Sequence, residues 1–142
     1  MADAVVFDTS AILALTGNEP GADIVQEYLA DAIAGRLELH ASFVSLTEVE
    51  YITTQEEGTD IARQRLVDLR ALPVQWLHSD AALCSDAAKL KAAHKISFAD
   101  AFVAATARRF DAALIHKDPE FRALAGMVKQ QMLPPKSAAQ GS

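Results

Sequence analysis

The stretch VVFDTSAIL, residues 5–13, decides the fold. It is apolar except for Asp8, Thr9 and Ser10, and it predicts a buried strand that runs directly into a helix. Asp8 stands at the junction, where burying a carboxylate is costly. The carboxylate either caps the helix or belongs to a functional site. The rest of the chain has to decide between these two interpretations.

The length and composition indicate one folded unit. The chain has 142 residues, of which 51% are hydrophobic, and this suits a single domain with a sizeable core. We expect that domain over residues 1–133. The segment 134–142 begins with two prolines and continues with small polar residues, so we expect a disordered tail there.

Charge and cysteine content limit the possible functions. The chain has 13 basic and 19 acidic residues, a net charge of -6, so binding to nucleic acid would need a local basic cluster. Cys84 is the single cysteine, which excludes an internal disulfide and indicates a reducing compartment. We expect it in the core. The sequence has no secretion signal and no membrane-length apolar run, so it predicts a soluble cytoplasmic protein.

Predicted strands alternate with predicted helices along the chain. We expect strands at 4–7, 37–41, 74–78, 112–116 and 127–133. We expect helices at 10–15, 21–34, from Ser42 or Ser45 to Gly58, and at 59–72, 79–94, 97–110 and 119–124. This alternation predicts an α/β fold, a three-layer sandwich with a central, mostly parallel sheet. Ligands of such sheets bind beyond the carboxyl ends of the strands.

Four acidic residues fall where this topology can bring them to one edge. Asp8 and Asp118 follow strands directly, whereas Glu48 and Asp100 lie on helices that follow strands. Each acid also has an ordinary structural explanation. Asp8 and Asp118 suit helix caps, Asp100 completes a capping-box pattern with Ser97, and Glu48 suits a solvated helix face. Singly, each structural explanation is at least as good as the functional one.

Together, the four acids favour a metal site. Asp100 shares a helical face with Ile96, Val103 and Ala104, which is an unusual place for a charge. Carboxylates that are brought together repel one another, and their pKa values rise unless a cation compensates. Ligand sets made only of oxygen favour Mg²⁺ or Mn²⁺. Phosphodiester hydrolysis is the chemistry that such a site performs best.

Four segments together resemble the acidic motifs of PIN-domain nucleases, and in size and arrangement most resemble the VapC toxins of toxin–antitoxin pairs. They are VVFDTSAIL (5–13), SLTEVEY (45–51), SFADAFVAATA (97–107) and LIHKDPEF (114–121). The resemblance implies a PIN-like α/β sandwich and an endoribonuclease that uses Mg²⁺ or Mn²⁺. It implies Asp8, Glu48, Asp100 and Asp118 as catalytic metal ligands, with the hydroxyl of Ser10 or Thr9 as support. It also implies a cognate antitoxin and a homodimer as partners.

The last motif departs from the family pattern. His116 and Lys117 stand where the family often has a hydroxyl residue and a small residue. His116 can replace the hydroxyl as a hydrogen-bonding support, or it can be a histidine at a strand end that faces solvent. Glu120 lies where the family often has a further acid, and it either reaches a second metal or is an ordinary first-turn acid. We rank Glu120 below the other four.

A basic run and two aromatic residues complete the set of candidates. The segment KLKAAHK, residues 89–95, precedes the Asp100 motif, so Lys89, Lys91 and Lys95, together with Lys117, are candidate RNA contacts. The alternative is a solvated helix face. Trp76 and Phe98 are expected in the core or at a dimer contact.

Competing functions remain. A phosphoaspartate enzyme of the haloacid-dehalogenase type needs a second acid two residues after Asp8, but that residue is Ser10. A receiver-type signalling domain needs its lysine on a separate strand, but Lys117 is adjacent to Asp118. A PIN-like domain that binds RNA or protein without cleaving it stays open, because His116 and Lys117 depart from the nuclease pattern.

Overall fold

A computed structural model describes residues 3–135 of the chain. Residues 136–142 of the tail that we expect to be disordered lie outside the described part. The elements, in chain order, are β1 (Asp3–Phe7), α1 (Thr9–Thr16), α2 (Ala22–Ile33), β2 (Leu37–Ser42), α3 (Phe43–Glu57), α4 (Thr59–Arg70), β3 (Gln75–Leu77), α5 (Ala81–Ala93), α6 (Phe98–Arg109), β4 (Ala113–His116), the 3₁₀ helix η1 (Pro119–Leu124) and β5 (Gln130–Met132). None of these helices has both the length and the apolar character needed to cross a membrane.

The five described strands form one sheet in the order β3-β2-β1-β4-β5, and all four pairings are parallel. From β1 the chain adds β2 and β3 on one side and then returns to add β4 and β5 on the other. The direction of winding therefore reverses between β1 and β4, which is where open α/β sheets bind ligands. The α/β fold that we predict from the sequence is confirmed, and the described sheet is parallel throughout.

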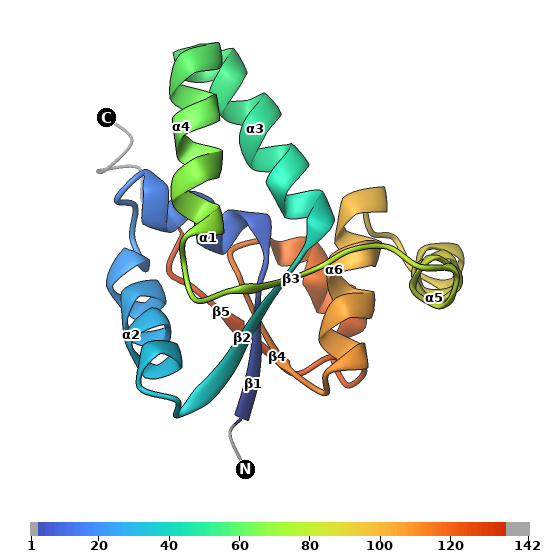
Figure 1. Cartoon of the computed structure of the whole chain (residues 1–142). Helices are drawn as coiled ribbons and strands as arrows, with labels where there is room; N and C mark the ends of the chain where they lie inside the picture. The colour runs from blue at the N-terminus through green and yellow to red at the C-terminus, as the bar shows by residue number, and fades with distance from the viewer. Residues whose placement is uncertain (1–2, 136–142) are drawn as a thin grey trace.

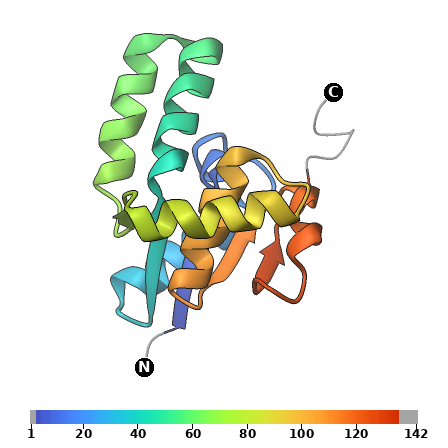
Figure 2. The same cartoon turned by 90° about the vertical axis from the view of Figure 1, so that its right-hand side faces the viewer.

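Helices cover both faces of the sheet, as Figure 1 and Figure 2 show. Helices α1 and α2 lie on one face, α6 lies on the other, and α5 packs outside α6. Helices α3 and α4 form a hairpin that projects beyond the carboxyl ends of the strands. Gly58 makes the corner of this hairpin with a φ of 96°, a conformation that side chains with a Cβ rarely adopt.

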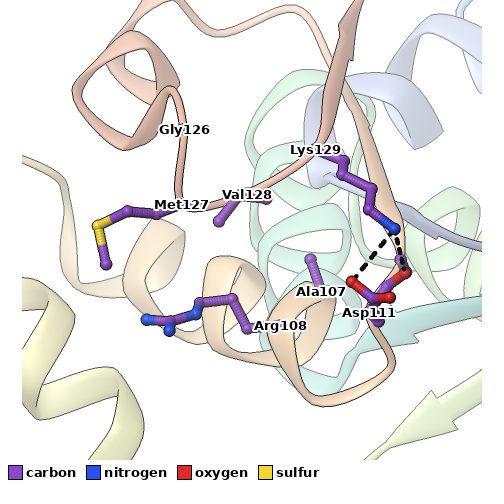
Figure 3. Close-up of a pocket in the computed structure, with 8 residues that line it drawn as sticks. Ala107, Arg108, Asp111, Gly126, Met127, Val128 and Lys129 are labelled. Atoms are coloured by element: carbon purple, nitrogen blue, oxygen red, sulfur yellow. Dashed lines mark hydrogen bonds and ion pairs between the residues drawn. The ribbon is translucent and has the colours of Figure 1, made fainter.

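The amino-terminal edge of the sheet has a hollow of about 400 Å³ between the end of α6 and the segment that leads into β5 (Figure 3). Two charged residues of its lining pair with each other. The Lys129 ammonium lies 3.2 Å from a carboxylate oxygen of Asp111 and also donates to the Asp111 carbonyl. Both side chains are largely exposed, so their charges are well hydrated.

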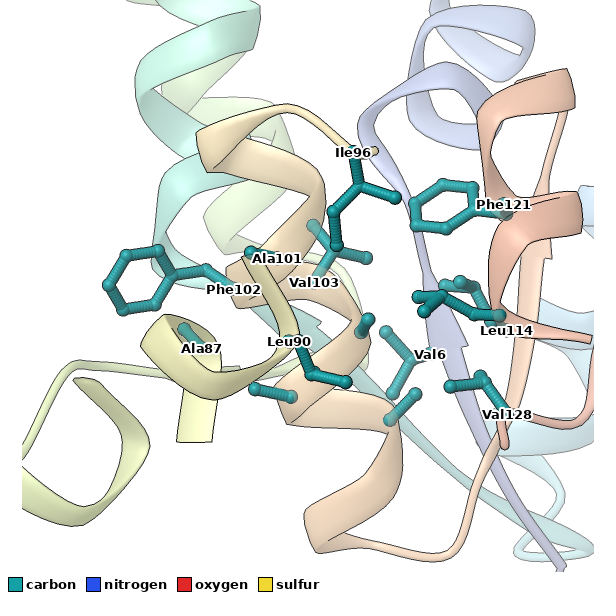
Figure 4. Close-up of a cluster of buried hydrophobic side chains, with 14 of the residues drawn as sticks. Val6, Ala87, Leu90, Ile96, Ala101, Phe102, Val103, Leu114, Phe121 and Val128 are labelled. Carbon is teal, nitrogen blue, oxygen red and sulfur yellow. The ribbon is translucent and has the colours of Figure 1, made fainter. Parts of the chain in front are cut away.

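Side chains alternate between two cores along β1, which is the period-two pattern of a strand. Val6 packs with Leu114 and with the α6 side of the molecule, in the cluster that Figure 4 shows. Val5 and Phe7 pack on the opposite face, with α1, α2 and the base of the hairpin. Burying both faces of β1 fixes the strand, and so it fixes the position of Asp8 at its end.

One packing expectation is wrong, and for Phe98 only the dimer-contact alternative remains. Cys84 is exposed on α5 instead of buried in the core. Phe98 leaves 71% of its surface exposed, so it is not a core residue. Trp76 is half-buried and packs against the core on the α1 side.

Candidate metal centre

Asp8 caps α1 with one carboxylate oxygen and leaves the other without a partner. Its Oδ2 accepts hydrogen bonds from the Ser10 backbone N–H (3.1 Å) and from the Ser10 hydroxyl (2.5 Å). Its Oδ1 is buried and has no hydrogen-bond partner among the described residues. The whole residue is only 3% exposed. Helix capping therefore accounts for the Oδ2 atom of Asp8, but the buried Oδ1 atom needs another explanation.

Asp100 lies in the first turn of α6 and is also buried, with 6% of its surface exposed. Ser97 caps the helix by accepting a hydrogen bond from the Asp100 backbone N–H (3.1 Å). This bond uses the backbone of Asp100 and does not satisfy its side chain. The Asp100 Oδ2 atom is buried without a partner in the described part of the chain. Two buried carboxylate oxygens thus lie unsatisfied at the carboxyl edge of the sheet.

Asp118 and Glu120 bring two more carboxylates to Asp100. One carboxylate oxygen from each of these three residues lies within 4.8 Å of the others. Asp118 Oδ1 also accepts a hydrogen bond from the Glu120 backbone N–H (2.9 Å), so the predicted cap of η1 is present as well. The sequence ranks Glu120 below the other acids, but the structure brings it directly into this group.

Glu48 approaches Asp8 from α3. Its Oε1 accepts a hydrogen bond from the Thr9 hydroxyl (2.6 Å), and that hydroxyl lies 2.8 Å from the Ser45 hydroxyl. Glu48 is half-buried, and its charge acts on Asp8. The five residues Asp8, Glu48, Asp100, Asp118 and Glu120 are called the acidic cluster below.

The cluster raises the pKa values of its two most buried carboxyl groups. Burial, the largest cause, raises the pKa of Asp8 to about 6, and the charge of Glu48 adds to this effect, while the hydrogen bonds from Ser10 oppose it. The pKa of Asp100 rises to about 9, first because of burial and then because of the Asp8 charge and the nearby Glu120 and Asp118 carboxyl groups. Burial and the neighbouring carboxyl groups thus both favour the protonated form of Asp100.

A divalent cation fits this arrangement. The donor atoms are all carboxylate oxygens, which is the ligand type that Mg²⁺ and Mn²⁺ prefer. The unsatisfied oxygens of Asp8 and Asp100 are buried, so they pair poorly with bulk water. A cation would offset the repulsion that raises both pKa values. Asp8, Asp100, Asp118 and Glu120 are the residues that could hold it, with Glu48 beside them.

His116 holds the backbone of Asp118 through a hydrogen bond. It is 1% exposed, so the alternative of a histidine facing solvent is wrong. Its Nδ1 accepts a hydrogen bond from the Asp118 backbone N–H (3.1 Å), and its Nε2 lies 2.9 Å from the side-chain oxygen of Gln130. Because Nδ1 accepts, the ring proton is on Nε2 and is donated to Gln130. Burial lowers the pKa of His116, which keeps the ring neutral for this role. No sequence pattern pointed to Gln130.

Ser10 and Lys117 connect the two halves of the site. The Lys117 backbone N–H donates to the Ser10 hydroxyl (2.8 Å), which ties the end of β4 to the start of α1. The Lys117 ammonium donates to the Pro20 carbonyl (2.9 Å) and lies 3.4 Å from a Glu19 carboxylate oxygen. Its side chain is 9% exposed. This corrects the expectation that Lys117 contacts RNA, because its charge is used inside the protein.

The other three lysines named from the sequence stay on the surface. Lys89, Lys91 and Lys95 are exposed along and just after α5. Lys89 also lines a hollow of about 410 Å³ between α5 and α6, to which Arg108 and Arg109 contribute. Lys91 is in the last turn of α5, and Lys95 lies in the short connection between α5 and Phe98, the first residue of α6.

The family model for the PIN domain matches residues 5–127. The chain belongs to the PIN domain family. The match includes the whole acidic cluster, and so it confirms the resemblance that the four motifs indicate. Comparison with curated protein sequences gives no match.

Solved structures show the same PIN fold at low sequence identity. VapBC2 from Rickettsia felis bound to a DNA fragment from its promoter has a TM-score of 0.72 at 14% identity, covering 92% of this chain and 99% of that one. DNA-bound VapBC from Salmonella typhimurium has a TM-score of 0.71 at 14% sequence identity, and the match covers 93% of this chain and 98% of that one. VapC20 from Mycobacterium tuberculosis is a toxin that cleaves the sarcin–ricin loop. It has a TM-score of 0.69 at 22% sequence identity, and the match covers 92% of this chain and 99% of that one.

Proposed function

We propose that this PIN domain is a metal-dependent endoribonuclease that hydrolyses RNA phosphodiester bonds. The observation that carries the proposal is the pair of buried carboxylate oxygens, on Asp8 and Asp100, without partners among the described residues. Unpaired buried carboxylates cost stability, and they gather at functional sites where a bound ligand compensates for them. Asp8 directly follows β1, at the switch point between β1 and β4, which is where open α/β sheets bind ligands.

The proposed chemistry is hydrolysis without a covalent intermediate. A bound Mg²⁺ or Mn²⁺ would hold a phosphate oxygen, lower the pKa of a water molecule and offset the negative charge that develops on the phosphate oxygens. In the net reaction the water oxygen forms a new bond to phosphorus, the bond from phosphorus to the leaving ribose oxygen breaks, and that oxygen takes up a proton.

The residues of this chain hold the site in place for that reaction. Ser10 orients Asp8, Thr9 orients Glu48, and His116 fixes the backbone of Asp118. Neighbours that hold metal ligands in this way are expected to matter nearly as much as the ligands themselves. Glu120 is the exposed member of the acidic cluster, and Asp118 and Glu48 are half-buried.

A role as the toxin of a type II toxin–antitoxin pair follows from the likeness to VapBC structures. In this proposal a cognate antitoxin protein covers the acidic cluster until it is removed, and the toxin forms a homodimer in the cytoplasm. Support for RNA as the substrate comes from the likeness to VapC20, which cleaves the sarcin–ricin loop. Lys89, Lys91 and Lys95 would provide local positive charge for the RNA on an otherwise acidic chain.

The competing function is a PIN-like domain that binds RNA or protein without cleaving it. The reason to consider it is that His116 and Lys117 depart from the family pattern. In the structure both residues have supporting contacts around the site, so the departure no longer favours a lost activity.

The decisive experiment is cleavage of structured RNA by the purified protein with Mn²⁺, with Mn²⁺ and excess chelator, and by the Asp100→Asn variant. We expect cleavage only by the wild-type protein with free Mn²⁺. Equal cleavage by the variant would indicate a contaminating nuclease. No cleavage under any metal, together with retained RNA binding, would move the function to the non-cleaving alternative.

A further inference from the structure

Several large hydrophobic residues are exposed, and Phe98 is the most exposed aromatic residue among them, with 71% of its surface accessible. Isolated exposed apolar residues are common and need no explanation by themselves. The position of Phe98 is unusual, however, because it is the first residue of α6 and stands two residues before Asp100. An exposed apolar ring therefore shares the first turn of α6 with a buried member of the acidic cluster.

Helix geometry places Phe98 and Asp100 on different sides of the first turn of α6. Residues two apart are rotated by about 200°, while their Cα atoms are only about 5 Å apart. Asp100 faces Asp118 and Glu120, which belong to the η1 side. A strand of RNA that crosses the start of α6 could thus place a phosphate on one side and an adjacent base on the other.

A row of aromatic rings holds Phe98 in place. Its ring meets that of Phe102 edge to face, with a centroid distance of 5.2 Å, and Phe102 meets Phe43 in the same way at 5.4 Å. Figure 4 shows Phe102 on the side of α6 that lies away from Phe121. Phe102 is 7% exposed, so the row has a buried base and one exposed end. The contact with Phe102 restrains the Phe98 ring, while 71% of the surface of Phe98 stays accessible to a ligand.

The charges around Phe98 favour a polyanion as the ligand. Lys91 and Lys95 are exposed at the end of α5 and in the short connection that leads to Phe98. An interface with another protein would favour neighbouring apolar residues over lysines. An exposed aromatic ring that follows exposed lysines in the chain is instead a combination typical of sites for single-stranded nucleic acid, where bases stack on rings and phosphates meet cations.

We propose that Phe98 is a stacking platform for a nucleobase of the RNA, next to the phosphate that is cleaved. The inference rests on the proposed ribonuclease function and adds a substrate requirement to it: the base beside the scissile phosphate must be unpaired. Phe98 is a positioning residue in this scheme, since the acidic cluster performs the chemistry.

The first measurement uses Phe98→Trp as a fluorescent reporter in a Trp76→Phe background, which removes the one native tryptophan. The protein is mixed rapidly with a short single-stranded oligouridylate and Mn²⁺, so that binding is recorded before cleavage. The control reporter is Ile33→Trp, at another highly exposed apolar position. We expect the oligouridylate to quench the reporter at position 98, an abasic ribose-phosphate oligomer to quench it far less, and neither to quench the reporter at position 33.

The second measurement is cleavage by Phe98→Ala and Phe98→Tyr in the native background. Loss of one stacked base is expected to raise KM by about tenfold or more in Phe98→Ala and to leave Phe98→Tyr close to wild type. On RNA that is abasic beside the scissile phosphate, Phe98→Ala and wild type should become equal. The mass of each variant in solution is measured in parallel.

These results separate the possible outcomes. If wild type cleaves the oligouridylate but the Phe98→Trp reporter is not quenched, or if Phe98→Ala keeps the wild-type KM, the proposal is wrong. If Phe98→Ala changes the oligomeric mass without changing KM, Phe98 contacts a second copy of the chain instead. If wild type shows no cleavage that depends on metal and on Asp100, the proposed function fails, whatever the fluorescence shows.

Discussion

The two edges of the sheet differ in how their charged residues are buried and paired. At the carboxyl edge, Asp100, Asp118 and Glu120 bring carboxylate oxygens within 4.8 Å of one another, and Asp8 and Asp100 each bury an oxygen without a partner among the described residues. At the amino edge, Asp111 is 88% exposed and pairs with Lys129. Charges at the amino edge are hydrated and balanced, and they cost the fold little. Charges at the carboxyl edge are costly unless a cation joins them, which marks that edge as the functional one.

The largest expected difference between the edges is in activity. Asp100→Asn should lower Mn²⁺-dependent RNA cleavage by about 100-fold or more, because an essential metal ligand is worth several kcal/mol in the transition state. Asp111→Asn, the matched acid at the amino edge, should leave cleavage unchanged. Initial rates on one RNA substrate measure both, and circular dichroism checks that each variant is folded. A comparable loss in both variants would contradict the assignment of the site.

Metal binding should stabilise the carboxyl edge. At about 100 times its dissociation constant, Mn²⁺ is expected to add about 2.7 kcal/mol to the free energy of unfolding and to raise Tm by several degrees. Asp100→Asn should lose most of this increase, whereas Asp111→Asn should keep it. Thermal unfolding with Mn²⁺ and with chelator measures the effect. An unchanged Tm of the wild-type protein over a wide range of Mn²⁺ concentrations would count against a metal centre.

The metal-free protein should become less stable as pH rises, relative to a variant without the buried charge. The native pKa of Asp8 is about 6 and its unfolded value is 3.8, so the native state holds a proton that the unfolded state has already released. The loss in the free energy of unfolding that the buried Asp8 charge causes is absent below pH 3.8 and complete above about pH 6, where it reaches about 3 kcal/mol.

Urea unfolding of wild type and Asp8→Asn at a series of pH values, with chelator present, isolates this effect. The free energy of unfolding of Asp8→Asn should exceed that of wild type by a growing margin between about pH 4 and pH 6. Titrating groups far from Asp8 cancel in the difference between the two proteins, whereas Asp100, whose pKa the Asp8 charge raises, does not. A constant margin over that range would mean that Asp8 has an ordinary pKa.

A smaller effect is expected from the residue that orients Asp8. Ser10→Ala removes a donor to Asp8 and the acceptor of the Lys117 N–H. We expect a loss of about 1–2 kcal/mol in the free energy of unfolding and about tenfold slower cleavage. Ser10→Thr, which keeps the hydroxyl, should recover part of both. Chemical denaturation and initial rates report the two effects separately.

The smallest effect should come from the amino edge itself. Lys129→Ala breaks the exposed pair with Asp111, and we expect no measurable change in Tm, in cleavage or in the response to Mn²⁺. If this substitution lowered cleavage, the hollow that Lys129 lines would take part in substrate binding, and the contrast between the two edges would fail.

Much of this organisation could be predicted from local patterns. The apolar run at 5–7, the turn residues and the alternation of strands and helices indicate a parallel α/β fold, and the strands and helices occur close to where we expect them. Asp8 and Asp118 lie at strand ends, so the rule for ligand sites in such sheets brings them to one edge. Helix capping could not be separated from metal binding in the sequence, because the same carboxylate can cap with one oxygen and leave the other free.

Local patterns were enough to predict the helices and strands, the mostly parallel sheet and the acids of the site, because hydrophobic period and strand-end position are local properties. The use of each side chain depends on the folded arrangement. That arrangement brought Glu120 to Asp100, turned Lys117 toward Pro20, buried His116 against Gln130 and left Phe98 exposed. These outcomes depend on contacts between segments far apart in the chain, and the strength of burial and charge coupling follows from those contacts rather than from local sequence.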